Sequence, residues 1–531
     1  MSPVDPKRWR YSPAFLIPLI VCGCGWLVAP PLLWPDTSTG LLAWRNFAEG
    51  GTWNTIVEPS AIDLTVNRES TITWWSPGQY LPLGLLWMAG LPLGAGMLFL
   101  ALLSAASLAS GLCRVARELG APEAALPWIA VAATGSWHSL YAFGMFNGGE
   151  IGLIALFPWV LLAGWRLRHR PIRSIVLLPP LLLIGSFVKH SFAIYALGLL
   201  AFLWLEALRN CPATLRARAR VTLPLAIVGG IYALARAAVF TPGPSPSDPG
   251  QIARTFVESF GFSALAPLLA ATGGGSFCGR LFMMAGLPTQ SGWQIVAGPL
   301  VLLAPVALAI YLSLARGHRP ITRLAGVVAL TTTTTLAVLI WRGGSISLDD
   351  RHFRPAGVLL LAVIAGATAN VSGRWRQGVA RACILVIVAY GFGAALNRHL
   401  SMRQSVHPSI DHTSITDFPP SAQAELQRLD AAASGTDGII YLSKTELSVL
   451  TQHARLIVTD AVDRDVPWFV HQPRHGRVAS ITLVLPERFA RDGRGAALRA
   501  SFVDYPTTAW TCQTVAGWDF WQARVSPSST L

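Results

Sequence analysis

Long apolar runs recur from the N-terminus to about residue 397 of this chain, and they constrain its fold more than any other feature. A run of about 20 apolar residues is long enough to cross a bilayer as a helix. The composition agrees, because 52% of the 531 residues are hydrophobic, 13% are charged and the mean hydropathy is +0.48. We therefore predict a polytopic α-helical membrane protein with about eleven spanning helices. The predicted spans are 13–34, 94–113, 125–143, 151–166, 175–188, 191–208, 222–240, 292–314, 322–341, 355–371 and 382–397.

Arginine gathers in alternate loops between these runs. The positive-inside rule predicts that such loops face the cytoplasm. The N-terminus is then cytoplasmic, and the chain after about residue 398 lies outside, in the periplasm or the extracellular space. The arginine clusters lie at 114–117, 166–173, 209–220, 316–323 and 374–381.

The net charge of +14 and the pI near 10 follow from this topology. Because the excess arginine lies in short loops between apolar runs, it predicts membrane orientation, and we expect no nucleic-acid partner. Lysine occurs only at positions 7, 189 and 444. That bias favours a GC-rich bacterial genome and hence the bacterial inner membrane.

The loops on the opposite face are longer. Two of them, at about 35–80 and 241–291, are rich in Gly, Pro, Ser and Trp, so we expect function on that face. Within the first of these loops, the sequence of residues 38–49 predicts an interfacial helix. After this loop, the sequence of residues 80–94 predicts a short re-entrant or interfacial helix. Residues 1–397 then form the membrane domain.

Residues 398–531 have the composition of a soluble protein. Strand patterns alternate with helix patterns, which predicts a small extracytoplasmic α/β domain. No GxGxxG, Walker, CxxC or GxSxG motif occurs in it. The predicted helices are 421–433 and 445–452, and the predicted strands are 438–442, 455–459, 480–485, 497–503 and 518–525.

Ionisable residues beside a span are costly and mark candidate functional sites. Asp36 follows the first span and Glu150 opens the fourth, both on the predicted outer face. Two carboxylates there can divide acid/base or metal-binding work. Alternatively, Asp36 caps the helix that follows and Glu150 favours a helix N-terminus through its dipole.

Cations lie on the same predicted face. Lys189 and His190 sit between two apolar runs, and Lys189 suits a lipid-linked phosphate or snorkels to the headgroups. Arg351, His352 and Arg354 precede the tenth span. Either arginine can clamp a phosphate in a bidentate way, or both anchor the interface, and His352 alone does not decide between these interpretations.

Aromatic residues follow the first long loop. Trp75 and Tyr80 flank Ser76-Pro77-Gly78-Gln79, beside Trp74. Their rings offer a stacking surface for a sugar, and an aromatic belt at the interface predicts the same residues.

Taken in order, these positions resemble the GT-C superfamily of membrane glycosyltransferases, which includes protein O-mannosyltransferases and the aminoarabinose transferases of lipid A. The likeness lies in Asp36 after the first span, the 77–82 segment at a broken second helix, and Glu150. It continues in Lys189 and in an Arg-His-Phe-x-Pro string at 351–355 that resembles the family's Arg-Tyr-x-x-Pro. Asp36 lacks the second acid that follows it in several families, and Lys189 is followed by His190.

The resemblance implies a polyprenyl-phosphate sugar donor and a lipid, glycan or protein acceptor on the extracytoplasmic face. Asp36 would act as general base with inversion at the anomeric carbon, and Lys189 and Arg351 would stabilise the departing lipid phosphate. Glu150 would position the acceptor or a divalent cation, the one cofactor that the resemblance suggests.

Two other functions compete with this interpretation. A lipid or solute transporter also needs many spans and buried charge, but it usually shows inverted repeats, and we find none in the sequence. A noncatalytic assembly or sensor protein would use the outer domain to bind a partner. The long outer loops and the outer α/β domain favour the enzyme.

Overall fold

The computed structural model describes residues 12–73, 75–146, 148–240, 255–276, 320–343, 348–368, 373–434, 437–459, 462 and 467–524. The chain divides into two compact units. One comprises Met1–Leu27 and Phe99–His399, and we call it the helical unit. The other comprises Val28–Leu98 and Leu400–Leu531, and we call it the sheet unit.

The predicted spans that fall on described residues are mostly helical, which confirms the polytopic helical class, although the first is shorter than predicted because α1 ends at Val28. Among the described residues, seven helices are long and apolar enough to cross a membrane: α4, α7, α8, α9, α10, α14 and α16. The predicted span at 292–314 lies outside the described residues. The helices are α1 (Ser12–Val28), α4 (Leu93–Glu118), α5 (Leu126–Gly135), α6 (Trp137–Gly144), α7 (Gly148–Leu167), α8 (Pro171–Val188), α9 (Phe192–Arg209), α10 (Leu215–Val239), α11 (Phe256–Thr272), α14 (Pro320–Trp341), α15 (Arg354–Thr368) and α16 (Arg374–Met402).

The predicted span at 125–143 is not one continuous helix. It breaks between α5 and α6 at Ser136, whose backbone is extended (φ −67°, ψ 151°). Glycine 391 of α16 packs against this break so closely that a Cβ there would lie 2.3 Å from the Gly135 carbonyl oxygen. A broken helix is tolerated at membrane depth where protein buries it, and Ser136 is buried.

Helix α11 lies inside the segment expected as a long outer loop. A capping box at its N-terminus satisfies two backbone donors, because Thr255 and Glu258 each accept from the other's backbone N–H. Its C-terminus ends at Gly273 in the left-handed conformation (φ 74°). The helix packs on α14 and α15. Three glycines, at 273–275, end and follow the helix, and Gly275 comes close to Asp350, just before α15.

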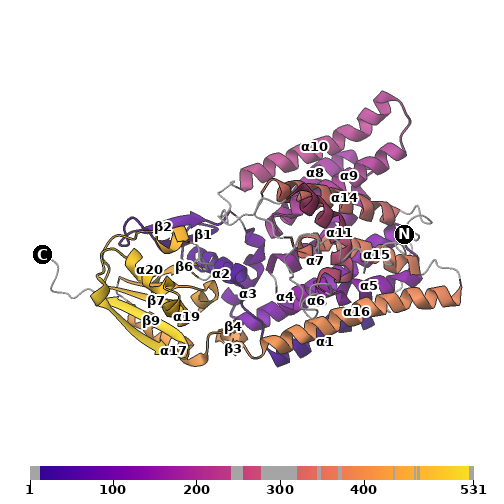
Figure 1. Ribbon diagram of the computed structural model, residues 1–531. Coiled ribbons are helices and arrows are strands. Elements are labelled where there is room, and N and C mark those ends of the chain that lie inside the picture. Colours follow the sequence, from indigo (N-terminus) through magenta and orange to yellow (C-terminus); the bar gives the residue numbers. More distant parts are fainter. Residues whose placement is uncertain are drawn as a thin grey trace. The chain divides into compact units, whose positions relative to one another are not determined.

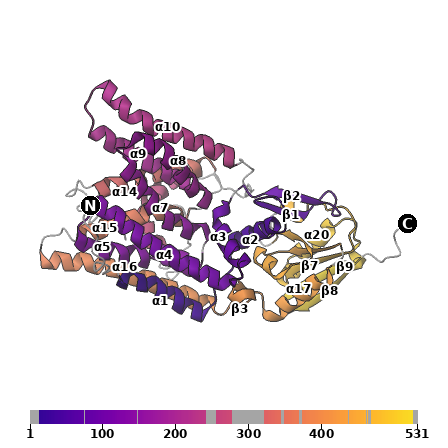
Figure 2. The ribbon, with the colours of Figure 1, turned by 180° about the vertical axis from the view of Figure 1, so that it is seen from behind.

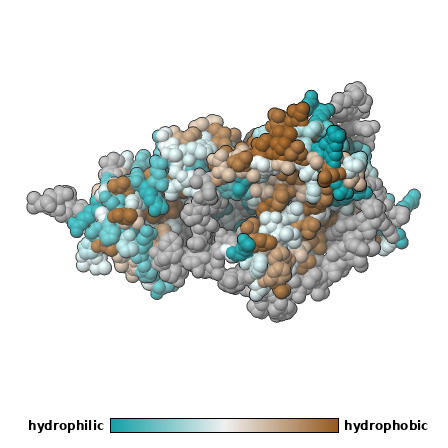
Figure 3. Space-filling model, turned by 90° about the horizontal axis from the view of Figure 1, so that it is seen from above, coloured by the Kyte–Doolittle hydropathy of each residue, from teal (hydrophilic) through white to brown (hydrophobic). Residues whose placement is uncertain are grey.

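The helical unit exposes apolar side chains on its surface (Figure 3). Leu223 and Leu234 of α10 are 62% and 74% exposed. A soluble protein would bury such residues, whereas hydrocarbon tails solvate them. Helices α1 and α16 lie side by side in both ribbon views (Figure 1 and Figure 2). Gly25 of α1 leaves room for the His399 ring of α16.

The sheet unit is built on a five-stranded sheet of order β6-β5-β7-β9-β8, seen in Figure 1. Strands β6, β5 and β7 run parallel, whereas β9 and β8 add on antiparallel. Its strands and helices after residue 405 are β3 (Val406–Pro408), β4 (Ser414–Thr416), α17 (Pro420–Ala432), β5 (Gly438–Leu442), β6 (Arg455–Val458), α18 (Pro467–Val470), β7 (Ser480–Pro486), α19 (Arg488–Arg491), α20 (Arg494–Ser501), β8 (Trp510–Val515) and β9 (Trp518–Arg524).

The predicted mixed α/β class of this region is confirmed, with two corrections. The predicted strand at 497–503 is wrong, because Arg494–Ser501 forms helix α20 after Gly493, and buried positions recur there at a spacing of three. The predicted helix at 445–452 is a 3-10 helix, η6 (Thr445–Leu450). Strand β8 was not predicted.

Residues from the early part of the chain complete the sheet unit. Helix α2 (Pro35–Ala48) is followed by a hairpin of β1 (Thr55–Pro59) and β2 (Asn67–Thr71), the turn η2 (Pro77–Gln79) and α3 (Leu81–Met88). Leu64, from the hairpin loop, is fully buried in the same core as Ile439 and Phe502. Its backbone N–H donates to the carbonyl of His475 at 2.6 Å.

Candidate functional site

Glu150 stands between two cations in the interior of the helical unit. It lies in the first turn of α7 and is 4% exposed. Lys189 Nζ donates to its Oε1, and Arg354 Nη1 lies 3.4 Å from its Oε2. The structure therefore brings together three predicted site residues that lie far apart in the sequence.

Local helix geometry explains two of these positions. Glu150 at the start of α7 and Lys189 at the C-cap of α8 both complement the helix dipoles. Arg354 opens α15, where a cation is unfavourable to the dipole, and it is 2% exposed. Its placement is explained by the pairing with Glu150.

The charges immediately around Glu150 are unequal. One carboxylate faces one ammonium and one guanidinium, which leaves an excess of one positive charge among these three side chains. A buried excess charge is costly, and the buried carboxylate of Asp350, whose contact with His138 is described below, compensates this one. Lys189 and Arg354 both present cationic N–H groups, and such groups suit an anion such as a phosphate.

Two further residues, which the sequence analysis did not single out, extend the cluster. Arg354 Nε lies 3.5 Å from His138 Nδ1, and His138 Nε2 lies 3.1 Å from Asp350 Oδ2. Both His138 and Asp350 are buried. The helix break at Ser136 places His138 at the start of α6. The rule that singled out Glu150, that an ionisable residue within a span is costly, also applies to His138.

Arg351 and His352 lie in the 3-10 turn η4 (Asp350–Phe353) that precedes α15. Asp349 accepts a hydrogen bond from the Arg351 backbone N–H at 2.8 Å, and its Oδ2 lies 3.1 Å from Arg351 Nε. Burial, together with the nearby Lys189 and Arg351 charges, lowers the pKa of His352 to about 3. His352 is then neutral near pH 7 and supplies no positive charge to the cluster.

His190, beside Lys189, packs edge-on against the ring of Phe240 at a centroid distance of 4.8 Å. This contact places its ring against the end of α10, at the residue that caps that helix. Its predicted role in substrate binding stays a prediction.

The other predicted site residues belong to the sheet unit. Asp36 is exposed in the first turn of α2. Trp75 is half-buried and packs with Tyr80 in a cluster around Trp44. Tyr80 is 2% exposed, and its hydroxyl donates to Asn54 Oδ1 at 2.6 Å. The stacking role of these two rings stays a prediction.

The described residues do not favour a resident divalent cation at Glu150. No group of three or more His, Cys, Asp or Glu side chains with metal-binding geometry occurs among them. Both carboxylate oxygens of Glu150 already face cations, which would repel an added metal ion. A carboxylate held this way is suited to orienting Lys189 and Arg354.

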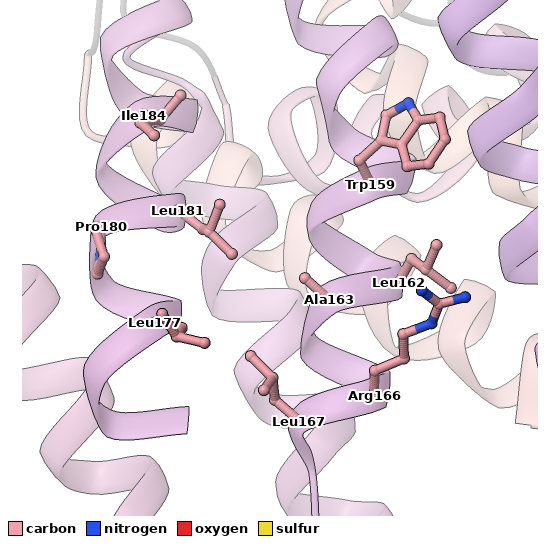
Figure 4. Close-up of a pocket in the computed structure, with 9 residues that line it drawn as sticks. All are labelled: Trp159, Leu162, Ala163, Arg166, Leu167, Leu177, Pro180, Leu181 and Ile184. Atoms are coloured by element: carbon pink, nitrogen blue, oxygen red, sulfur yellow. The ribbon is translucent and has the colours of Figure 1, made fainter. Parts of the chain in front are cut away.

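A separate groove lies between the C-terminal half of α7 and the middle of α8 (Figure 4). Its volume is about 490 Å³. Arg166, which pairs with Glu118, is the one charged side chain in its lining, so the groove suits hydrocarbon better than acid–base chemistry. Arg166 lies sixteen residues after Glu150 on the same helix, or about 24 Å along its axis. The lining residues are Trp159, Leu162, Ala163, Arg166, Leu167, Leu177, Pro180, Leu181 and Ile184.

Comparison with known proteins gives a match at the level of structure. No protein-family model and no curated protein matches the chain. A solved structure of ArnT from Cupriavidus metallidurans bound to undecaprenyl phosphate superposes with a TM-score of 0.56 over 98% of this chain and 99% of that one. The chain has the ArnT fold. The apo structure of the same ArnT matches with a TM-score of 0.53 over 96% of this chain and 98% of that one.

Sequence identity to ArnT is 13% in both comparisons, so the similarity establishes the fold. It covers nearly the whole chain, with the spanning helices and the C-terminal domain together. The resemblance to the GT-C type, drawn from short motifs and their order, is thereby confirmed at the level of fold. The protein is a multi-pass membrane protein with an ArnT-like architecture.

Proposed function

We propose that this protein transfers a sugar from a polyprenyl-phosphate donor to a lipid, glycan or protein acceptor. The observation that carries the proposal is the pairing of Glu150 with both Lys189 and Arg354, which holds two cationic donors together in the interior of the helical unit. An ArnT of the same fold has been solved with undecaprenyl phosphate bound, which supports the same class of lipid as ligand.

The cluster supplies the electrostatic part of the reaction. When the bond between the anomeric carbon and the phosphate oxygen breaks, the lipid phosphate leaves with an additional negative charge. Lys189 and Arg354 stabilise this charge, and because Glu150 already holds them in place, little reorganisation is needed during the reaction. Arg351, with 43% of its side chain exposed, is available to the outer part of the donor.

Asp36 is the general base in this proposal. It removes the proton from the acceptor hydroxyl while that oxygen attacks the anomeric carbon, so the configuration inverts. Its position in the first turn of α2, where it is exposed, suits a carboxylate that must meet a substrate. Trp75 and Tyr80 are proposed to shape the sugar side of the site.

The arginine clusters support an orientation with the N-terminus in the cytoplasm. Asp36 and the sheet unit then face the periplasm of a bacterial inner membrane. The donor enters laterally from the outer leaflet.

The test is transfer of radiolabelled sugar from polyprenyl-phosphate donors by purified protein in membranes. Asp36→Asn removes the base with little change of shape, and transfer should fall at least 100-fold, the lower range for a lost general base. Asp492→Asn, an exposed carboxylate of the sheet unit that pairs with Arg494, is the matched control and should transfer like wild type. Equal transfer by Asp36→Asn removes Asp36 from the mechanism. No transfer from any donor favours a transporter.

A further inference from the structure

We propose that His138, held in one tautomer by Asp350, is a positioning residue that orients Arg354 and so sets the affinity of the site for a lipid-linked phosphate. The inference rests on the proposed function. It concerns two residues, His138 and Asp350, that touch neither Glu150 nor Lys189 in the contacts described above.

The contacts assign the tautomer of His138. The Nε–H of an arginine is always a donor, so the His138 Nδ1 that lies 3.5 Å from it must accept and carries no proton. The proton of the neutral imidazole is then on Nε2, which lies 3.1 Å from Asp350 Oδ2. The negative charge of Asp350 beside Nε2 favours a proton on that nitrogen, and so favours the tautomer whose Nδ1 lone pair faces Arg354.

These contacts fix the plane of the Arg354 guanidinium. Nε donates to His138 Nδ1 at 3.5 Å, and Nη1 forms an ion pair with Glu150 at 3.4 Å. The ring of Tyr141 lies 5.9 Å from Cζ. Because the guanidinium is planar and rigid, two fixed edges determine the direction of the remaining N–H groups. A phosphate bound there meets donors that are already oriented, which reduces the entropy cost of binding.

A purely structural role would not require this arrangement. Replacing a buried ionic network with apolar side chains of similar volume often leaves the stability of a protein unchanged or raises it. Gly275 approaches Asp350 so closely that a Cβ would lie 2.4 Å from Oδ2, so the backbone itself makes room for the carboxylate. An ordered chain of five groups, from Lys189 through Glu150, Arg354 and His138 to Asp350, is expected where orientation matters.

The test compares two substitutions of His138. A positioning role and a purely structural role predict opposite orders for their effects on undecaprenyl phosphate affinity. His138→Asn keeps an acceptor near the Nδ1 position but leaves unfilled volume. His138→Phe fills the volume and has no acceptor. Binding of undecaprenyl phosphate to purified protein in detergent is measured against undecaprenol, which lacks the phosphate, and each variant's melting temperature is recorded.

The positioning role predicts that His138→Phe weakens undecaprenyl phosphate binding about tenfold or more, whereas His138→Asn stays within about threefold of wild type. In transfer assays the loss in His138→Phe should appear in KM for the donor more than in kcat. If affinity instead follows the melting temperature, so that Asn binds worse than Phe, the proposal is overturned.

A second pair of variants tests whether His138 acts through Arg354. In an Arg354→Gln background, adding His138→Phe should cause no further loss of affinity, because the group that it orients is gone. An independent, additive loss contradicts the proposal. Should His138→Phe not fold, Asp350→Leu tests the tautomer step, with an expected loss of threefold to tenfold, and unchanged affinity in folded Asp350→Leu overturns it.

The controls separate this inference from the proposed function. Glu206→Gln removes a different buried carboxylate, paired with Arg323 at 2.8 Å, and should leave undecaprenyl phosphate affinity unchanged. If wild type does not prefer undecaprenyl phosphate to undecaprenol, the proposed function fails. If wild type has that preference and His138→Phe keeps it in full, the inference alone fails.

Discussion

The hydroxyl of Tyr195 donates a hydrogen bond to the backbone carbonyl of His352, and this contact joins helix α9 to the turn that leads into α15. Tyr195 is 1% exposed. The bond fixes the turn from which Arg354 begins its helix.

Tyr195→Phe is expected to lower the free energy of unfolding by about 1–3 kcal/mol, because a buried carbonyl loses its partner. Donor affinity should also fall, since the turn before Arg354 is less constrained. Thermal melting and undecaprenyl phosphate binding measure the two effects. Tyr232→Phe, which breaks a buried contact with Ser186 at 2.5 Å, is the control and should affect melting alone.

Glu150→Gln leaves Lys189 and Arg354 buried without their carboxylate. Breaking a buried ion pair from one side costs about 3–5 kcal/mol, so the yield of folded protein and its melting temperature should drop sharply. Adding Lys189→Met restores the net charge of the cluster and should recover much of the stability without restoring transfer. A double variant that is no more stable than Glu150→Gln would show that charge balance is not the cause.

Gly357→Ala tests the packing one turn after Arg354. A Cβ at Gly357 would lie 2.8 Å from backbone atoms of Ala270 and Ala271 in α11, and backbone cannot move aside as a flexible side chain can. The overpacking should cost about 1–3 kcal/mol of stability and weaken donor binding. Gly366→Ala, on the same helix with nothing within 4 Å of its Cβ position, should melt at or above the wild-type temperature.

Acid stability should depend on His352. Its pKa is lowered from 6.5 to about 3, so between these values the unfolded chain binds a proton that the folded chain excludes. Stability contributed by neutral His352 is therefore present above about pH 6.5 and is lost as pH falls toward 3. His352→Gln should lose less melting temperature than wild type between pH 7 and pH 4. Parallel curves for the two proteins would contradict this assignment.

The helix content of the chain could be predicted because it depends on local features. Run length and loop charge predicted where most of the described helices of the helical unit lie, and the order of short motifs predicted the fold type. The break at Ser136 could not be predicted from its own sequence. It depends on the close approach of Gly391, which lies far along the chain.

The candidate site was predictable in part for the same reason. Glu150, Lys189 and Arg354 could be named because each is a charge beside an apolar run, although their pairing depends on how the helices pack. His138 lies among apolar and aromatic residues, and one titratable side chain there gives a weaker signal than a cluster does. In the sheet unit, residues 497–503 alternate in polarity enough to suggest a strand, whereas Gly493 in the left-handed conformation begins helix α20.

The sheet unit draws its residues from both sides of the helical unit in the sequence, and this has a consequence for biosynthesis. Leu64 donates to the carbonyl of His475, and Leu33 donates to the carbonyl of Ser414 at 3.0 Å. At about 5–20 residues per second, the ribosome needs roughly 15–60 s to make residues 99–399. During that interval residues 28–98 have been made, whereas their partners after residue 399 have not yet been made. We therefore expect residues 28–98 to be the part of the nascent protein most open to proteases and chaperones.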